Sequence, residues 1–265
     1  MSSGFPYKTV LVLGATSGIG LALAEKLVEN GSHVVAVGRR AENLASLQQK
    51  HGKDRVSIAQ FDVTDLAGIP AFADSITKSH PALDGVVVNA GIQRRLDLTN
   101  PPSIDLAQVS AELTTNYLSP VHLVTAFLPH LQRQPTPTSL IFTTSGLALV
   151  PILRCPNYCA SKAALHHLIL CLREQLRAGG SRVKVVEVLP PAVQTELHDS
   201  KHQPDIKDGG SMGMPLDEFT DEMWTGLCAG KTDVPVGMAK KSYEGWEGQR
   251  QSVFRGMVEE GLGAL

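Results

Sequence analysis

A tyrosine and a lysine stand four residues apart in the segment Tyr158-Cys-Ala-Ser-Lys162. On a helix, this spacing places both side chains on one face, about one turn apart. A phenol has an ordinary pKa of about 10, and a nearby ammonium group lowers it by favouring the phenolate. The pair could therefore exchange a proton with a bound substrate. The start of an amphipathic helix would explain the same spacing without any chemistry.

Ser145 and Asn116 are two further candidates for this chemistry. Ser145 follows an apolar run that we expect to be a strand, so it should lie at the carboxyl edge of a sheet, where doubly wound folds bind ligands. Its hydroxyl could hydrogen-bond a substrate carbonyl and stabilise a developing oxyanion, or it could cap the next turn. Asn116 lies inside an expected helix, where its amide could also serve only solvent or a backbone carbonyl.

A glycine-rich turn, Gly14-Ala-Thr-Ser-Gly18-Ile-Gly20, joins the first expected strand to the first expected helix. Glycines let the backbone turn tightly and approach a pyrophosphate, which the amides and dipole of the helix N-terminus then stabilise. Such a turn can use glycine for positive φ alone, but the strand before it and the helix after it favour phosphate binding. We therefore expect dinucleotide contacts from Gly14, Thr16, Ser17, Gly18, Ile19 and Gly20.

The second expected strand ends in Val37-Gly38-Arg39-Arg40, and this end indicates which dinucleotide is bound. NAD-preferring enzymes usually place an acidic residue here to hold the ribose hydroxyls, but the chain has Gly38. A guanidinium can form two parallel hydrogen bonds with a 2′-phosphate. The sequence therefore predicts NADP(H), with contacts from Arg39 and Arg40, although both could be solvated charges at the start of a helix.

Short β-branched runs alternate with helical periodicity along the chain, which predicts an α/β, doubly wound fold with a central parallel sheet of about seven strands flanked by helices. Strands are expected at 9–13, 34–37, 56–60, 85–88, 140–143, 183–189 and 233–236. Helices are expected at about 19–29, 41–50, 69–79, 103–133, 158–178, 216–227 and 243–262. We expect one domain over 1–265, with a substrate loop or lid at 194–230 and a C-terminal helical segment at 239–265.

The charge balance argues against several kinds of partner. Lysine and arginine total 24 against 26 aspartate and glutamate, so no net positive field would gather nucleic acid or an anionic membrane. The sequence shows no membrane-spanning run and no targeting signal, so we expect a cytoplasmic protein. The 4 cysteines lack metal-ligand spacing, and reduced thiols are expected, although Cys155 and Cys159 could form a redox pair. No metal is expected.

Several motifs occur in order along residues 8 to 197: the glycine turn, Asp62-Val63, Asn89-Ala90-Gly91, Asn116, Ser145, Tyr158-x-x-x-Lys162 and Pro190-x-x-x-x-Thr195. In this the chain resembles the short-chain dehydrogenase/reductase family, which has a Rossmann fold. The resemblance implies that Tyr158 is the general acid in reduction, with Lys162 lowering its pKa and bonding the nicotinamide ribose. It also implies that Ser145 orients the carbonyl and that Asn116 holds a water in a proton relay.

The resemblance also implies further cofactor contacts. These are Asp62 and Val63 at the adenine, Asn89, Ala90 and Gly91 in the cofactor cleft, and Pro190, Val193 and Thr195 near the carboxamide or phosphates. Two positions depart from the family pattern, since Leu13 stands where Thr is frequent and Pro191 where Gly is frequent.

The function implied is an NADP(H)-dependent oxidoreductase that interconverts a carbonyl and a secondary alcohol. The same fold could instead use bound NADP(H) for epimerisation, dehydration or cyclisation, or the chain could sense NADP(H) without catalysis. Relatives commonly form dimers or tetramers through the helices expected here at about 103–133 and 158–178, so a homo-oligomer is expected.

Apolar residues should lie near the pocket, which suggests a small, apolar carbonyl or alcohol substrate, although packing would explain most of them equally well. These residues are Leu147, Leu149, Ile152, Leu153, Val193, Leu197, Met212, Met214 and Trp224. His198 and His202 are expected to face solvent rather than bind a metal, because no acidic or cysteine partner stands at ligand spacing.

Overall fold

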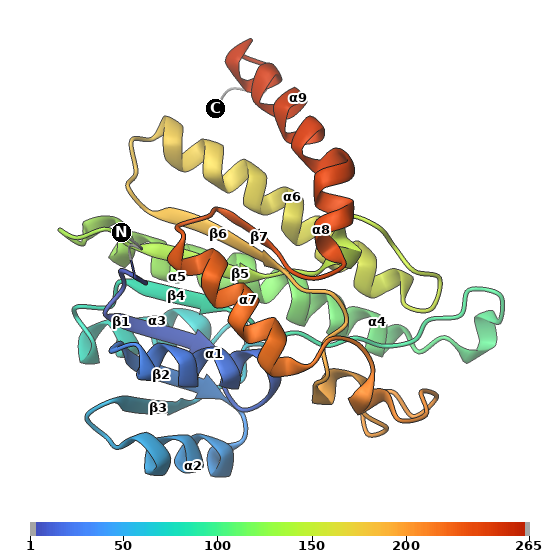
Figure 1. The fold of residues 1–265 in the computed structure, drawn as a ribbon, viewed down its shortest axis with the longest axis horizontal. Coiled ribbons are helices and arrows are strands. Elements are labelled where there is room, and N and C mark those ends of the chain that lie inside the picture. The colour runs from blue at the N-terminus through green and yellow to red at the C-terminus, as the bar shows by residue number, and fades with distance from the viewer. Residues whose placement is uncertain (1–3, 263–265) are drawn as a thin grey trace.

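The computed structural model describes residues 4–262, and its centre is a sheet of seven parallel strands in the order β3-β2-β1-β4-β5-β6-β7 (Figure 1). The order along the sheet reverses between β1 and β4. The predicted α/β fold with a seven-stranded parallel sheet is confirmed. The strands are β1 (Thr9–Leu13), β2 (His33–Gly38), β3 (Val56–Gln60), β4 (Gly85–Val88), β5 (Ser139–Thr143), β6 (Lys184–Leu189) and β7 (Asp233–Pro235).

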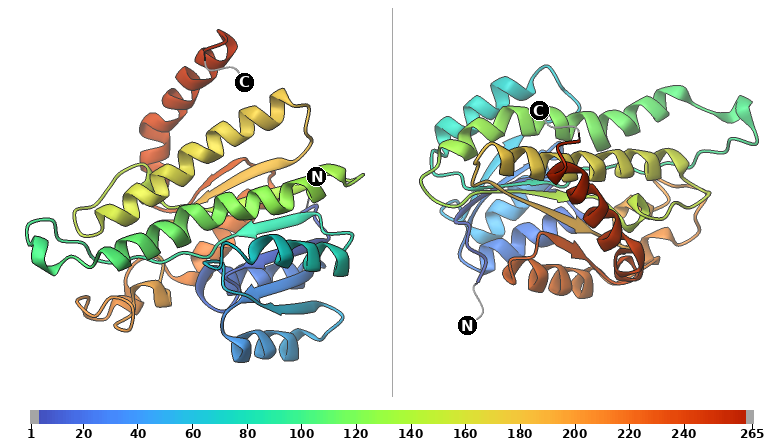
Figure 2. Two further views of the ribbon diagram at one scale, coloured as in Figure 1. Left: turned by 180° about the vertical axis from the view of Figure 1, so that it is seen from behind. Right: turned by 90° about the horizontal axis from the view of Figure 1, so that it is seen from above.

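Helices cover both faces of this sheet (Figure 2). On one face lie α1 (Gly18–Glu29), α2 (Ala41–His51) and α7 (Leu216–Cys228). On the other lie α3 (Ile69–Ser79), α5 (Ser119–Arg133) and α6 (Pro156–Ala178), with α4 (Leu106–Leu113) leading into α5. The C-terminal helices are α8 (Ala239–Ser242) and α9 (Gly248–Glu259), and α9 extends away from the sheet (Figures 1 and 2).

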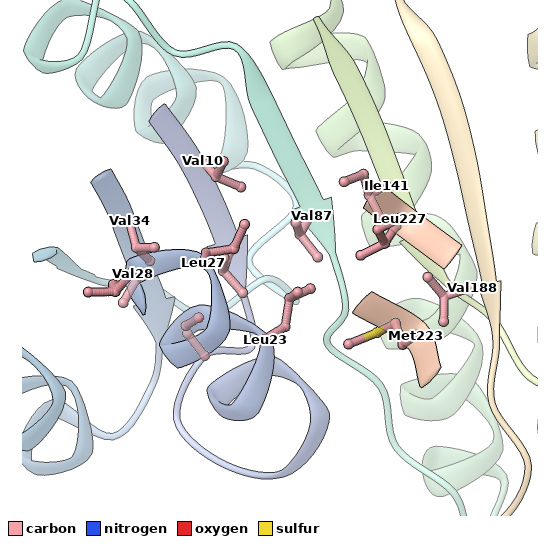
Figure 3. Close-up of a cluster of buried hydrophobic side chains, with 14 of the residues drawn as sticks. Val10, Leu23, Leu27, Val28, Val34, Val87, Ile141, Val188, Met223 and Leu227 are labelled. Carbon is pink, nitrogen blue, oxygen red and sulfur yellow. The ribbon is translucent and has the colours of Figure 1, made fainter. Parts of the chain in front are cut away.

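Side chains along each strand point alternately to the two faces of the sheet, so the hydrophobic core forms two layers. Val10 of β1 belongs to one cluster with Leu27 of α1 and Met223 of α7 (Figure 3), whereas Leu11, the next residue, belongs to the cluster that contains Phe127 of α5. Successive side chains of a strand point to opposite faces, so both faces of a fully covered sheet must be apolar. Burying each such side chain contributes roughly 1.5–3 kcal/mol.

The single helix expected over 103–133 is wrong in detail. A short 3-10 turn, Pro101–Ser103, comes first, and α4 then begins at Leu106 because the Asp105 carboxylate caps it by accepting from Ala107 N at 2.9 Å. Between α4 and α5 the backbone forms a π-helical turn over Thr114–Leu118. Pro120 has no amide to donate to the Asn116 carbonyl four residues earlier, which disfavours continuous α-helical bonding at this point.

The C-terminal helix also differs from the expectation of 243–262. It starts earlier, at α8, passes through a π-helical turn over Tyr243–Glu247, and ends as α9 at Glu259. Among residues 4–262, no helix has the length and apolar character needed to cross a bilayer.

Candidate active site

The predicted site residues converge at the carboxyl ends of four adjacent strands. Gly14 follows β1, Asn89 follows β4, Ser145 lies just beyond β5 and Pro190 follows β6. The strand order reverses between β1 and β4, and in open α/β sheets ligands bind in the crevice at such a point. The fold thus brings the glycine turn and the polar candidates to one edge.

The glycine turn has the geometry of a dinucleotide loop. Gly14 and Gly18 have φ angles of +87° and +53°, which favour glycine. A Cβ on Gly20 would lie 2.1 Å from the Gly14 carbonyl oxygen, so the turn can close only without a side chain there. Ser17 is the N-cap residue of α1, but its side chain accepts no hydrogen bond from the first backbone amides of the helix. The first turn of α1 also has no acidic residue. The helix amides and dipole are therefore available to an anion.

The end of β2 leaves no room for the acidic side chain that NAD-preferring enzymes usually carry there. A Cβ on Gly38 would lie 2.4 Å from the Thr16 methyl group, so an aspartate would not fit there without displacing Thr16. Arg40 already donates to Thr16 Oγ1 at 2.9 Å and to Ser17 Oγ at 2.5 Å, and it pairs with Glu196 at 2.7 Å. Arg39 is 69% exposed and has only a 3.7 Å contact with Asp62. Its guanidinium is the less engaged of the two.

Tyr158, Ser145 and Lys162 lie together. Tyr158 and Lys162 are both buried on the first turns of α6, and the Lys162 Nζ lies 5.8 Å from the centre of the Tyr158 ring. Ser145 hydrogen-bonds the Tyr158 side chain and also accepts from Leu147 N at 3.1 Å, so it caps the next turn as well. Lys162 Nζ donates to the Thr143 carbonyl at 2.9 Å.

The pKa of Tyr158 differs from the expectation. Burial raises it above its ordinary value, and the hydrogen bond with Ser145 opposes this effect without reversing it. The Lys162 ammonium is directed at the Thr143 carbonyl rather than at the phenol oxygen, so the expected lowering is not found. Burial also lowers the pKa of Lys162 to about 8, against the opposing charges of Glu187 and Glu112. These pKa values favour a protonated phenol beside an ammonium group at neutral pH.

Asn116 lies in the π-helical turn and has no exposed surface. Its side-chain oxygen accepts from Ile92 N at 2.9 Å, and its amide nitrogen donates to Ile92 O at 2.8 Å and to Ser161 Oγ at 3.0 Å. A Cβ on Gly91 would lie 3.3 Å from Asn116 Oδ1 and 3.4 Å from Lys162 Nζ. The Asn116 side chain thus fixes the loop after β4 beside Lys162, and it uses its hydrogen-bonding groups to do so.

The remaining predicted cofactor residues are divided between two loops. Asp62 Oδ1 accepts from Thr64 N and Oγ1, and these bonds together with Arg39 lower its pKa despite partial burial. The backbone carbonyl of Val63 accepts a hydrogen bond from Ser119 Oγ at 2.6 Å, and this bond holds Val63 in place. On the other side, the Thr195 methyl lies 3.1 Å from where a Gly18 Cβ would stand, so the segment that begins after Val193 packs on the glycine turn.

The expectations for Trp224 and His198 are wrong. Trp224 stacks on Phe5 at 5.1 Å between ring centres and packs on the core, and Leu153 is 98% exposed. His198 is buried rather than solvent-facing, because Gln203 of the same loop folds over it with 3.3 Å between Gln203 Nε2 and His198 Nδ1. Leu147 does lie at the site, against Tyr158.

A buried polar group that the motifs did not predict lies next to this site. Glu187 lies in β6 with no exposed surface, and its carboxylate accepts from Thr144 Oγ1 at 2.5 Å and faces His166 Nδ1 at 2.8 Å. The available signal was a carboxylate inside an otherwise apolar strand, Val-Val-Glu-Val-Leu, since such a residue must have a buried partner.

Comparison with known proteins agrees with this geometry. The family model of short chain dehydrogenases matches residues 8–205. The chain belongs to the short-chain dehydrogenase family. It is 37% identical over 227 residues to an uncharacterized oxidoreductase, DltE, of Bacillus subtilis, covering 85% of this chain and 86% of that protein. It is 30% identical over 221 residues to the benzil reductase ((S)-benzoin forming) IRC24 of Saccharomyces cerevisiae, covering 80% and 81%.

A solved structure of this oxidoreductase family matches over almost the whole chain. It is a short chain dehydrogenase from Burkholderia cenocepacia in complex with NADP, with a TM-score of 0.76 and 26% identity, covering 96% of this chain and 99% of that one. The predicted membership of the short-chain dehydrogenase/reductase family is confirmed, and with it the Rossmann fold.

Proposed function

We propose that this short-chain dehydrogenase reduces a small apolar ketone or aldehyde to an alcohol with NADPH, and catalyses the reverse reaction with NADP⁺. The observation that carries the proposal is the group formed by Tyr158, Ser145 and Lys162 at the sheet edge that also holds the glycine turn. The carbonyl chemistry named for the yeast relative supports the reaction class.

In this mechanism a nicotinamide bound at the glycine turn would supply the hydride that the carbonyl carbon accepts. Tyr158 donates its phenolic proton to the carbonyl oxygen, and its raised pKa keeps that proton in place at neutral pH. The Ser145 hydroxyl hydrogen-bonds the same oxygen as negative charge develops on it. The Lys162 ammonium, 5.8 Å from the ring centre, would stabilise the tyrosinate that remains by turning from the Thr143 carbonyl toward it, and a proton from solvent then restores the phenol.

Asn116 has a supporting part in the proposal. Its side chain is committed to Ile92 and Ser161, so a relay water would bind its main-chain carbonyl, for which Pro120 offers no amide partner. Leu147, Cys155 and Cys159 form an apolar group around Tyr158, which supports an apolar substrate.

The glycine turn fits the diphosphate of NADP(H), and Arg39 would hold the 2′-phosphate. We expect Arg39→Ala to lower kcat/KM for NADPH by about tenfold to a hundredfold, because a charge-assisted, bidentate contact is lost, and to leave kcat/KM for NADH within about threefold. Steady-state kinetics with both nucleotides measures this.

Arg40→Ala is the matched comparison for this substitution. Arg40 ties Thr16 and Ser17 to Glu196, so its loss should weaken both nucleotides about equally. If Arg39→Ala left the preference for NADPH unchanged, the assignment of the phosphate site would be wrong.

A panel of aldehydes, ketones and diketones tests the reaction itself. With NADPH and the purified protein, loss of absorbance at the reduced nicotinamide band is expected for at least one apolar member, with a matching amount of alcohol. Tight NADPH binding without turnover of any member would contradict the proposal.

A further inference from the structure

His166 is enclosed by two carboxylates in the interior of the protein. It follows Lys162 by one turn of α6 and has no exposed surface. Its Nδ1 lies 2.9 and 2.8 Å from the two carboxylate oxygens of Glu187, and its Nε2 lies 3.0 Å from Glu247 Oε1. A neutral imidazole has one N–H, so only the doubly protonated ring can donate to both carboxylates.

The surroundings of His166 favour its charged form. Burial lowers its pKa, but Glu187 and Glu247 outweigh burial and raise it to about 9. Arg250 of α9 bonds the other oxygen of Glu247 at 2.8 Å and lies 2.6 Å from His167. With His166 protonated, the two carboxylates face two cations, so the formal charges of the cluster cancel, as a buried cluster requires.

This cluster reaches the reactive residues through Glu187. The Thr144 hydroxyl, which bonds Glu187 at 2.5 Å, belongs to the residue directly before Ser145. Lys162 is bonded to the carbonyl of Thr143 on the same strand end, and Glu187 is the largest of the charges that hold its ammonium form against burial. Glu247 comes from the π-helical turn before α9, so this contact joins the C-terminal segment to the site.

We propose that Glu187, His166 and Glu247 form a positioning chain that holds Ser145 and Lys162 in place, and that the C-terminal segment is thereby a required part of the site. This proposal rests on the function proposed above, because it assumes that Lys162 and Ser145 act in that reaction. All three side chains are buried without exposed surface, so they act through Lys162 and Thr144.

Glu187→Gln is the sharpest test, because glutamine keeps the size and loses the charge. The titratable and charged groups facing Lys162 are Tyr158 of α6, Glu187 of β6 and Glu112 of α4, and those facing His166 are Glu187, Glu247, Arg250 and His167. We expect the alkaline limb of kcat, set by Lys162, to move to lower pH by about one unit. KM for the carbonyl should stay within about threefold, and Glu187→Asp should restore the position of the limb.

Glu244→Gln is the matched control, because Glu244 is exposed on the same turn as Glu247 and should leave the profile unchanged. A uniform loss of kcat at every pH in Glu187→Gln would mean that the chain is only structural, and would overturn the proposal. If no carbonyl is turned over, the proposed function fails, and the pH dependence of NADPH affinity is then measured in place of that of kcat. The positioning proposal is thus tested separately from the proposed function.

A measurement on the unmodified protein covers the case in which Glu187→Gln does not fold. In protein labelled with ¹⁵N-histidine, the His166 ring, assigned by comparison with His166→Asn or by its contacts, should carry two protons at pH 7.5 and lose one near pH 9. In Glu247→Gln that loss should occur at lower pH. A singly protonated His166 at pH 7.5 in the unmodified protein would overturn the proposal.

Discussion

Tyr158→Phe is expected to lower kcat for carbonyl reduction by about a thousandfold, within the range that loss of a general acid produces. The ring remains and still fills its buried place beside Leu147, so only the proton donor and its bond to Ser145 are lost. The affinity for NADPH, measured by fluorescence titration, should change by less than about threefold. Single-turnover kinetics at saturating NADPH would isolate the chemical step.

Tyr117→Phe provides the matched control for that substitution. Tyr117 lies in the π-helical turn next to Asn116 and packs on the core, away from the Tyr158 hydroxyl. It should retain nearly full activity. A Tyr158→Phe protein with more than a tenth of normal activity would remove Tyr158 from its assigned role.

Gly20→Ala is expected to have the second large effect, on binding and stability together. The added Cβ would lie 2.1 Å from the Gly14 carbonyl oxygen and 2.5 Å from Asn89 Nδ2, so the turn must open. Overpacking of this kind costs about 1–3 kcal/mol, and the displaced amides would weaken NADPH binding by a factor on the order of a hundred. Thermal denaturation and isothermal titration with NADPH measure the two effects.

Gly256→Ala is the control for the glycine substitution. Gly256 lies in α9, and a Cβ there would meet nothing within 4 Å. Alanine should be neutral or slightly stabilising at this helical position. Unchanged NADPH affinity in Gly20→Ala would contradict the assignment of the glycine turn to the pyrophosphate.

The sheet was predictable from sequence because its strands carry their own signals. Val34 to Val37 and Gly85 to Val88 are apolar on both faces, as only covered parallel strands are, and short turns of glycine and polar residues bound them. The order of motifs then placed Ser145 and Tyr158 at one sheet edge, because the carboxyl ends of parallel strands share an edge. Both predictions therefore use local residue patterns together with the rule that a doubly wound sheet binds ligands at the carboxyl edge of its strands.

Contacts that depend on how the chain folds back on itself were not predictable in this way. Glu247 meets His166 across 81 residues, and no periodicity relates the two positions. The burial of His198 depends on how Gln203 folds back over it, and the place of Trp224 depends on Phe5 near the N-terminus. In each case the partner is chosen by tertiary packing, which residue spacing does not encode.

Hydride transfer from labelled cofactor tests the central claim most directly. The protein would be incubated with NADPH carrying deuterium at nicotinamide C4, in each of its two stereochemical forms, together with the carbonyl substrate identified from the panel. The mechanism predicts one deuterium on the new carbinol carbon from one of the two forms, with an equal amount of NADP⁺. A converted substrate without deuterium from either form, and without net formation of NADP⁺, would show non-redox chemistry and contradict the account.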